Sequence, residues 1–205
     1  TTATTTTTTT MRHAVIKAAT DDYLSLTQDE REKTIFVIQS HRGRNHAHKL
    51  IRDDLKTKSM LQDEVTMPRL QSTNLSGPEL KQLESYTKGQ VLMLNGKYFT
   101  VQDKNNQTGE LKVYDEHGQA KTVFPEHLPP YAALFDRHQA ALAKGDLIKS
   151  TLSQKDKGVF GGTVYRVTNT HKDRVEAAEL NSDKTRVFST KELGDATWDF
   201  AYTTT

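Results

Sequence analysis

The sequence has 205 residues, of which 34% are hydrophobic, and its 28 basic residues nearly balance its 26 acidic ones. The low apolar fraction predicts a modest core, and the balanced charge argues against a protein whose whole surface is basic for nucleic-acid binding. Cysteine is absent, which excludes disulfides, a thiol nucleophile and a cysteine-ligated metal. No apolar run has the length of a membrane span or a secretory signal, so we expect no membrane insertion and no secretion by a signal peptide.

The chain starts with a low-complexity tail or unassigned segment, residues 1–10, which consists of nine threonines and one alanine. β-Branched threonine has poor helix propensity, so neither a core nor a stable helix is expected there. Apolar residues at helical spacing then predict a short helix over 12–26, and the polar run at 27–33 predicts a loop.

Residues 34–39 (TIFVIQ) are apolar and β-branched without alternation, which is typical of a strand buried on both faces of a parallel sheet. A one-faced helix is expected next, because four apolar residues share helical spacing: Ala47, Leu50, Ile51 and Leu55. Pro68 restricts a strand at 64–72 to a sheet edge, and a capped helix is predicted at 76–86. Residues 11–88 are therefore predicted to form an α/β part.

From Gly89 onward, short strands alternate with turn residues such as Asn95-Gly96 and His117-Gly118. This rhythm is typical of small antiparallel barrels or meanders, and it predicts two β-units, at 89–130 and 131–193. Residues 194–205 are predicted to include a buried strand that returns to the α/β part. The predicted fold class is α+β: a fragment of an α/β layer that the chain does not complete, with an inserted pair of β-units.

Motifs for catalysis are weak. There is no P-loop, and the glycine-rich run at 158–162 is better explained as a tight hairpin than as a phosphate loop. His46 and His48 resemble a metal-binding pair, but positions i and i+2 diverge by about 200° on a helix, so we interpret them as surface histidines. We therefore expect no catalytic residue, no metal site and no cofactor in this chain.

Two segments are locally basic, residues 41–58 and 144–174, and the second also carries Phe160 and Tyr165. Phosphate contacts combined with an aromatic stacking surface are how proteins bind single-stranded nucleic acid. The alternative is an ordinary charged surface with Tyr165 half-buried, and composition alone favours that alternative.

The order of these segments resembles the second motor domain of RecD-type superfamily 1 helicases. The resemblance is carried by TIFVIQSHRGRNHAHKLIRDDL (34–55), KGDLIKSTLSQKDKGVFGGTVYRV (144–167) and WDFAYTTT (198–205), and 144–167 is its strongest part. The stretch 89–193 is most similar to TraI-type conjugative relaxase–helicases. The resemblance implies a RecA-like edge with two inserted Src-homology-like barrels, the 2B-like unit (89–130) and the 2B unit (131–193).

Individual residues take implied roles from this resemblance. Arg44 lies where the family keeps a motif IV arginine, and His48 lies where asparagine is common. Lys144, Gly145 and Asp146 match the turn that opens the barrel, where the aspartate caps the turn. Lys157 and three glycines match a hairpin beside the DNA: Gly158, Gly161 and Gly162. The implied DNA-binding residues are Arg44, Lys149, Lys155, Lys157, Tyr165 and Arg166, and the implied partner-binding residues are Lys144, Lys149, Lys155 and Lys157.

The implied function is that of a non-catalytic domain serving as an internal translocation signal. It would be read by the type IV secretion coupling ATPase and would contact single-stranded DNA during plasmid transfer. ATP and magnesium are expected for the parent helicase rather than for this chain. We expect a monomer that is cytoplasmic in the donor bacterium and is transferred to the recipient. One alternative is a plain DNA-binding 2B module of a RecD-like helicase with no transport role, and another is an independent enzyme.

Overall fold

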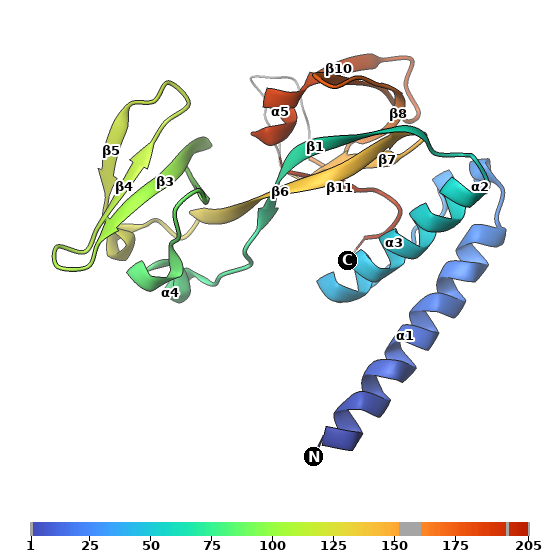
Figure 1. The fold of residues 1–205 in the computed structure, drawn as a ribbon, viewed down its shortest axis with the longest axis horizontal. Helices are drawn as coiled ribbons and strands as arrows, with labels where there is room; N and C mark the ends of the chain where they lie inside the picture. Colours follow the sequence, from blue (N-terminus) through green and yellow to red (C-terminus); the bar gives the residue numbers. More distant parts are fainter. Residues whose placement is uncertain (1, 152–160, 196, 205) are drawn as a thin grey trace.

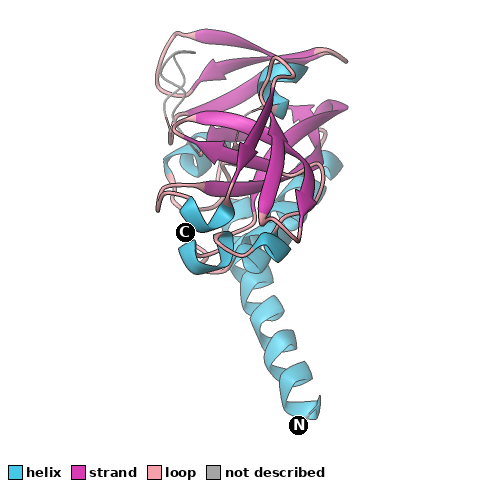
Figure 2. Cartoon of the chain, turned by 90° about the vertical axis from the view of Figure 1, so that its left-hand side faces the viewer, coloured by secondary structure: helices cyan, strands magenta, loops and turns pink. Residues whose placement is uncertain are grey.

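The computed structural model describes residues 2–151, 161–195 and 197–204, with the backbone alone described at 2–12 and 41. Three helices form one side of the molecule (Figure 1): α1 (Thr2–Ser25), α2 (Gln28–Lys33) and α3 (His41–Thr57). The N-terminal half of α1 projects away from the sheets (Figure 2). Val37 and Thr204 form a parallel β-bridge, in which Ile38 N donates to Thr204 O over 2.8 Å.

A six-stranded antiparallel sheet has the order β1-β6-β2-β3-β4-β5. Its strands are β1 (Gln62–Ser72), β2 (Val91–Leu94), β3 (Lys97–Asn105), β4 (Glu110–Tyr114), β5 (Ala120–Val123) and β6 (Ala133–Lys144). Three short helical elements accompany it: α4 (Gly77–Leu80), η1 (Leu83–Ser85) and η2 (Pro125–His127). β1 lies at the sheet edge, as Pro68 predicts, because proline cannot donate a ladder hydrogen bond.

A five-stranded antiparallel sheet has the order β10-β9-β8-β7-β11. Its strands are β7 (Leu147–Ser150), β8 (Val164–Thr170), β9 (Arg174–Glu179), β10 (Thr185–Ser189) and β11 (Trp198–Phe200), and α5 (Thr190–Gly194) follows β10. Within the described residues neither sheet closes on itself, so the predicted closed barrels are open sheets. The reason is that the β1/β6 ribbon packs against β8 as a second layer and does not pair with this sheet.

The β1/β6 ribbon runs between α3 with the five-stranded sheet and the strands β3–β5 (Figure 1). At one end Met67 and Leu142 join the core that contains Ile51 of α3 and Phe200 of β11. The strands β2–β5 enclose a separate core, which contains Leu134 of β6 at the other end of the ribbon. Two cores are therefore joined by one continuous pair of strands.

The segment 34–39, predicted as a strand, forms only the isolated bridge at Val37 and is buried on one face. Ile35 is 77% and Val37 57% exposed, whereas Phe36 stacks on Tyr23 at 5.6 Å and Ile38 is buried. The prediction of burial on both faces was wrong, because α1 and α3 cover one side of the segment and no described element covers the other.

Three predicted local structures were also wrong. Residues 27–33 contain the helix α2, because Thr27 and Glu30 form a capping box that hydrophobic periodicity cannot reveal. α1 starts at Thr2 within the threonine tail, because extending a formed helix needs far less free energy than starting one. The helix predicted at 76–86 breaks after Leu80, whose carbonyl oxygen accepts a hydrogen bond from the Tyr86 hydroxyl.

Candidate functional site

Helix α3 presents a row of three polar side chains to the five-stranded sheet. Ser40 caps the helix by accepting a hydrogen bond from Gly43 N over 3.1 Å. Arg44, His48 and Arg52 then follow at intervals of four residues, a spacing that places them on one face. Two aspartates of the sheet region, Asp146 and Asp199, lie opposite this row.

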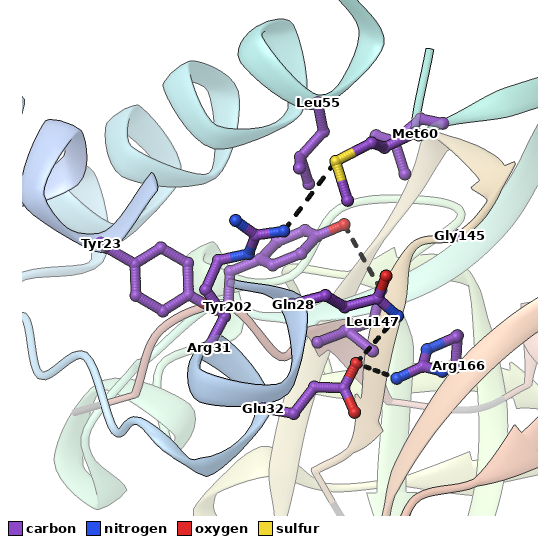
Figure 3. Close-up of a pocket in the computed structure, with 11 residues that line it drawn as sticks. Tyr23, Gln28, Arg31, Glu32, Leu55, Met60, Gly145, Leu147, Arg166 and Tyr202 are labelled. Carbon is purple, nitrogen blue, oxygen red and sulfur yellow. Dashed lines mark hydrogen bonds and ion pairs between the residues drawn. The ribbon is translucent and has the colours of Figure 1, made fainter. Parts of the chain in front are cut away.

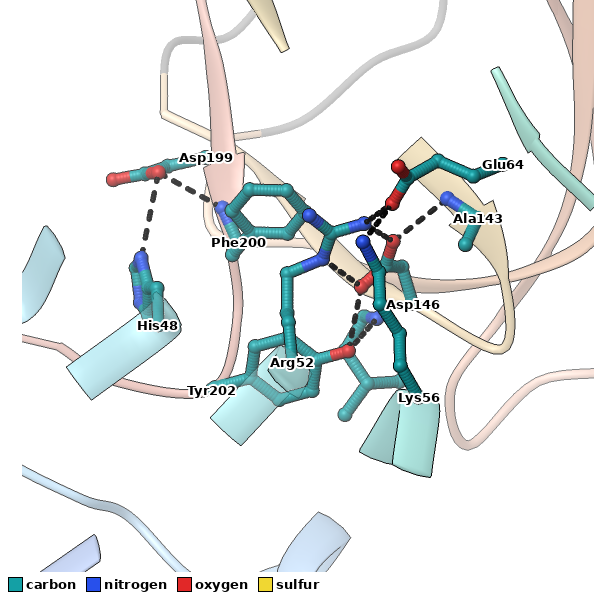
Figure 4. Close-up of polar contacts among 10 residues, drawn as sticks. His48, Arg52, Lys56, Glu64, Ala143, Asp146, Asp199, Phe200 and Tyr202 are labelled. Atoms are coloured by element: carbon teal, nitrogen blue, oxygen red, sulfur yellow. Dashed lines mark hydrogen bonds and ion pairs between the residues drawn. The ribbon is translucent and has the colours of Figure 1, made fainter. Parts of the chain in front are cut away.

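Asp146 is fully buried at the turn between β6 and β7, and four hydrogen bonds from the protein reach its carboxylate (Figure 4). Arg52 donates to both carboxylate oxygens over 2.9 Å. The Tyr202 hydroxyl and Ala143 N each donate over 2.7 Å. The contact with Ala143 N confirms that Asp146 caps this turn. The carboxylate is saturated, so its role is structural.

Gly145 precedes Asp146 in the same turn and has a φ of 97°. A Cβ atom there would lie 2.3 Å from the carbonyl oxygen of Met60, so only glycine fits. Burial raises the pKa of Tyr202 well above its usual value, and the negative charge of Asp146 raises it further. The tyrosine therefore stays protonated and acts as a hydrogen-bond donor.

Asp199, in β11, faces cationic side chains from two other elements. Its Oδ1 accepts hydrogen bonds from Arg69 Nη1 over 2.8 Å and from Phe200 N over 2.9 Å. Arg44 Nη1 lies 3.9 Å from its Oδ2, and His48 Nδ1 lies 4.0 Å from its Oδ1. Two guanidinium groups thus share one carboxylate.

His48 is buried beside Asp199, with 4% of the residue exposed, so the prediction of a surface histidine was wrong for this residue. Its Nε2 lies 2.7 Å from Thr203 Oγ1. Burial is the main cause that lowers the pKa of His48 to about 4; Asp199 opposes this shift, and nearby cations including Arg44 contribute to it. The imidazole is therefore neutral at neutral pH.

Lys149 of β7 completes the group. Its Nζ donates to Thr203 O over 3.1 Å. Burial lowers the pKa of Lys149, and Arg44 lowers it further, while Asp199 acts in the opposite direction. Arg44 and Lys149, two of the predicted DNA-binding residues, thus lie around the same carboxylate.

A cavity of about 250 Å³ opens beside this group, between α3, the end of β1 and β11. Trp198 lines it but is buried, with Nε1 donating to Pro68 O over 3.3 Å and the Arg69 guanidinium 5.8 Å from the ring centroid. The cavity is lined by Arg44, Asn45, Arg69, Leu70, Gln71, Ser72, Asn74, Phe135, Thr151, Thr197, Trp198 and Asp199.

The other predicted site residues lie elsewhere. Tyr165 is 6% exposed and packs edge-on against Phe188 at 5.3 Å between ring centroids, which removes it from a base-stacking role. Arg166 is paired with Glu32 of α2, in a small pocket that Tyr23 and Arg31 also line (Figure 3).

Lys144 is exposed at the end of β6, opposite Gln62. The predicted residues Lys155, Lys157 and Gly158 lie outside the described residues.

Sequence reasoning missed Arg69 and Asp199, the closest ion pair at the cavity. Both are charged residues within segments that otherwise indicate a strand. Arg69 comes directly after Pro68, and Asp199 stands between Trp198 and Phe200. A single charge inside an aromatic strand is the signal that could have found Asp199, because buried charges need partners. Among the residues with described side chains, no group of histidine, aspartate and glutamate could hold a metal ion.

The comparisons with known proteins place the chain near proteins of bacterial conjugation. The multifunctional conjugation protein TraI of Escherichia coli is 23% identical over 194 residues, which cover 92% of this chain and 11% of that protein. TraI of Escherichia coli strain K12 is 22% identical over 167 residues, which cover 80% of this chain and 10% of that protein. The chain thus spans about a tenth of these relatives and is related to TraI over most of its own length. No family model matches the sequence, and no helix in the described part of the chain is long and apolar enough to cross a membrane.

Proposed function

We propose that this chain is a non-catalytic domain of a conjugative relaxase–helicase that serves as an internal translocation signal for type IV secretion. In this proposal the secretion coupling ATPase reads the folded domain, and the domain also contacts single-stranded DNA during plasmid transfer. The supporting observation is the similarity to TraI along 92% of the chain, which spans only 11% of that much longer conjugation protein. Catalysis, ATP and magnesium would belong to other parts of the parent protein.

The use of the buried ionisable groups supports a non-catalytic role. Asp146 is saturated by Arg52, Tyr202 and a backbone amide. His48 is neutral and hydrogen-bonded to Thr203, with a pKa of about 4 that suits neither a general base nor a general acid at neutral pH. These side chains hold the α3 row against the sheet.

The fold supports recognition of a folded surface. β1 and β6 pair along nine registered positions although about sixty residues or more separate them in sequence, so their surface exists only in the folded chain. Lys144 is exposed at the end of this ribbon and is our candidate contact for the coupling ATPase. Charges at the rim of an interface set the orientation and rate of encounter, which is the role we give it. The domain would be cytoplasmic in the donor before it is transferred.

The experiment is delivery of a reporter fused to residues 11–205 from donor to recipient cells that share the cognate secretion machinery. The whole span is needed, because the β-units alone (89–193) lack β1, Arg52 and Tyr202, on which β6 and Asp146 depend. We expect contact-dependent delivery that Lys144→Glu reduces. Lys81→Glu, an exposed change directly after α4, should leave delivery intact. No delivery of the folded fusion, when the parent protein is still delivered, would contradict the translocation role.

The second candidate is a plain DNA-binding module without a transport role. The concentration of Arg44, Arg69 and Lys149 around one carboxylate favours it, because clustered cations suit contact with a phosphate backbone. A fusion that binds single-stranded DNA but is not delivered would favour this second candidate.

A further inference from the structure

The cavity beside Asp199 lies where three parts of the molecule meet. Arg44 and Asn45 come from α3, Arg69 and Ser72 from β1, and Asp199 from β11. Because each wall is a different element, the positions of these side chains are fixed by the fold as a whole. A preformed position costs a ligand less on binding than a mobile one.

The charged side chains that line the cavity are mainly positive. The side chains of Arg44 and Arg69 are 12% and 14% exposed, and Asp199, which they share, is 18% exposed. Arginine stays charged in proteins, so the lining carries two positive charges and one negative charge at low exposure. Lys149 lies close enough for Arg44 and Asp199 to shift its pKa. An anion in the cavity would therefore be attracted, because positive charge at low exposure is stabilised by a negative partner.

Two buried polar atoms of the cavity residues lack a hydrogen-bond partner in the described structure. They are Nε of Arg69 and Oγ1 of Thr197. Native structures leave few such groups, and a bound ion or water is among the explanations for those that remain. Asn45, Gln71, Ser72 and Thr151 add neutral groups that can donate hydrogen bonds around the same space.

We propose that this cavity binds a phosphate group of a single-stranded nucleic-acid backbone, with Arg44 and Arg69 as its charged ligands. The proposal rests on the DNA-contact part of the proposed function and assigns its place. Guanidinium groups match phosphate oxygens in geometry and charge, and hydroxyl and amide side chains are common further donors to phosphate and sugar.

The size and shape of the cavity define the contact as one with the backbone. Its volume of about 250 Å³ lies just below the roughly 300–1,000 Å³ of pockets for whole small molecules, so it suits one phosphate and part of a sugar. The Trp198 ring is buried and has the Arg69 guanidinium over it, so no base stacks there. Binding at this place is therefore independent of base sequence.

The test measures binding of a labelled oligothymidylate to the whole chain by fluorescence anisotropy. Arg44→Gln should weaken binding about tenfold, because a charge-assisted contact to phosphate is lost. It should also lower the salt slope by about 0.7, the value for one neutralised phosphate of a single strand. The matched control is Lys49→Gln, which removes one charge from an exposed position of α3 outside the cavity.

A second pair of variants avoids the ion pairs of Asp199. Asn45 is exposed on α3 at the cavity wall, so its replacement leaves the core intact. Asn45→Asp should weaken strand binding about tenfold and Asn45→Lys should strengthen it several-fold, because they add opposite charges to the same place. Equal affinities for wild type, Arg44→Gln and Asn45→Asp would overturn the assignment.

Inorganic phosphate identifies the group that is bound. The Nε–H signal of Arg69 in nuclear magnetic resonance spectra should shift with phosphate but not with chloride at equal ionic strength. A mononucleotide should compete with the strand only weakly, because a strand adds contacts along its backbone. A mononucleotide that competes as well as the strand, or an acidic peptide that binds where the strand does not, would overturn the choice of ligand.

The two proposals fail separately. Strand binding that depends on Arg44, in a fusion that is not delivered, would overturn the translocation role and support the cavity. If the chain is delivered and its affinity for single-stranded DNA does not change when Arg44 or Asn45 is replaced, only the assignment of the cavity is overturned. A wild-type chain that binds neither strand nor phosphate would overturn the cavity together with the DNA-contact part of the function.

Discussion

Asp146 and Asp199 are two carboxylates of one sheet region that face arginines of the same helix, yet their surroundings differ. Asp146 is 0% exposed and receives two hydrogen bonds from Arg52, one from Tyr202 and one from Ala143 N. Asp199 is partly exposed and has one close arginine, Arg69, with Arg44 at the longer distance of 3.9 Å. The first carboxylate is enclosed by its donors, whereas the second borders a cavity.

The contrast shows how a single helix face can serve both stability and binding. His48 stands between the two sites on α3, four residues after Arg44 at the open site and four residues before Arg52 at the closed one. A saturated charge holds a fold together, and a charge beside a cavity is available to a ligand. The predictions below test this division, in order of expected effect.

The largest effect is expected from Asp146→Asn. The substitution removes the buried carboxylate that Arg52 contacts with two nitrogens and leaves it only the more exposed Glu64. Removing one partner of a buried pair costs about 3–5 kcal/mol. Urea unfolding should show this loss in the free energy of unfolding. Asp53→Asn, an exposed change on α3, serves as the control and should shift it by less than about 0.5 kcal/mol. A loss under about 1 kcal/mol for Asp146→Asn would end the assignment of Asp146 as the structural centre.

The second effect is a pH dependence from His48. Its pKa is about 4 in the folded chain, against 6.5 as the ordinary value, so the unfolded chain binds the proton more tightly. Stability should therefore fall as pH drops from 6.5 to 4, by about 3 kcal/mol in total. The free energy of unfolding, measured across this window, should depend less on pH in His48→Gln than in wild type. His138→Gln, at an exposed position, should keep the wild-type dependence.

A smaller loss of stability, about 1–2 kcal/mol, is expected for Asp199→Asn, because Asp199 is partly exposed and asparagine keeps one acceptor oxygen. The same change removes a negative charge from the cavity, so phosphate and strand binding should become tighter. Thermal unfolding and the anisotropy titration measure the two effects. Weaker strand binding in a folded Asp199→Asn chain would mean that the carboxylate itself positions the ligand.

The smallest effect is expected from Tyr202→Phe, which removes one of several donors to Asp146. The loss should be about 1 kcal/mol, because Arg52 and Ala143 N still satisfy the carboxylate. Strand binding should stay unchanged, since Tyr202 does not line the cavity. A loss as large as that of Asp146→Asn would show that the tyrosine, and not the arginine, holds the carboxylate in place.

Local signals in the sequence predicted the turns well. Asn95-Gly96 and His117-Gly118 were predicted as turns, and Gly96 and Gly118 have φ values of 74° and 77°, a region that glycine adopts without strain. The turn at Gly145 and Asp146, with the aspartate as its cap, was predicted from the family resemblance and not from a local signal, and the structure contains it.

The partners across long distances in sequence were not predictable in the same way. The pairing of β1 with β6 and the burial of His48 under Thr203 depend on segments that are far apart in the chain. A single sequence shows which residues are apolar, but it does not show which strands pair with each other in a sheet. The cavity is formed by elements that are far apart in the sequence. Arg44 and Lys149 were therefore found only from a resemblance, and Arg69 and Asp199 only from the structure.

The parallel bridge between Val37 and Thr204 gives the molecule an unusual topological description. Two parallel β segments need a crossover connection, which in most proteins is a single helix of about a dozen residues or more. Here α3 and the two sheets together form that connection, since the chain from 38 to 203 starts and ends at neighbouring backbone positions. Doubling the length of a flexible loop costs only about 0.6 kcal/mol in closure entropy, so a crossover is a place where a chain can gain whole folded bodies at little thermodynamic cost.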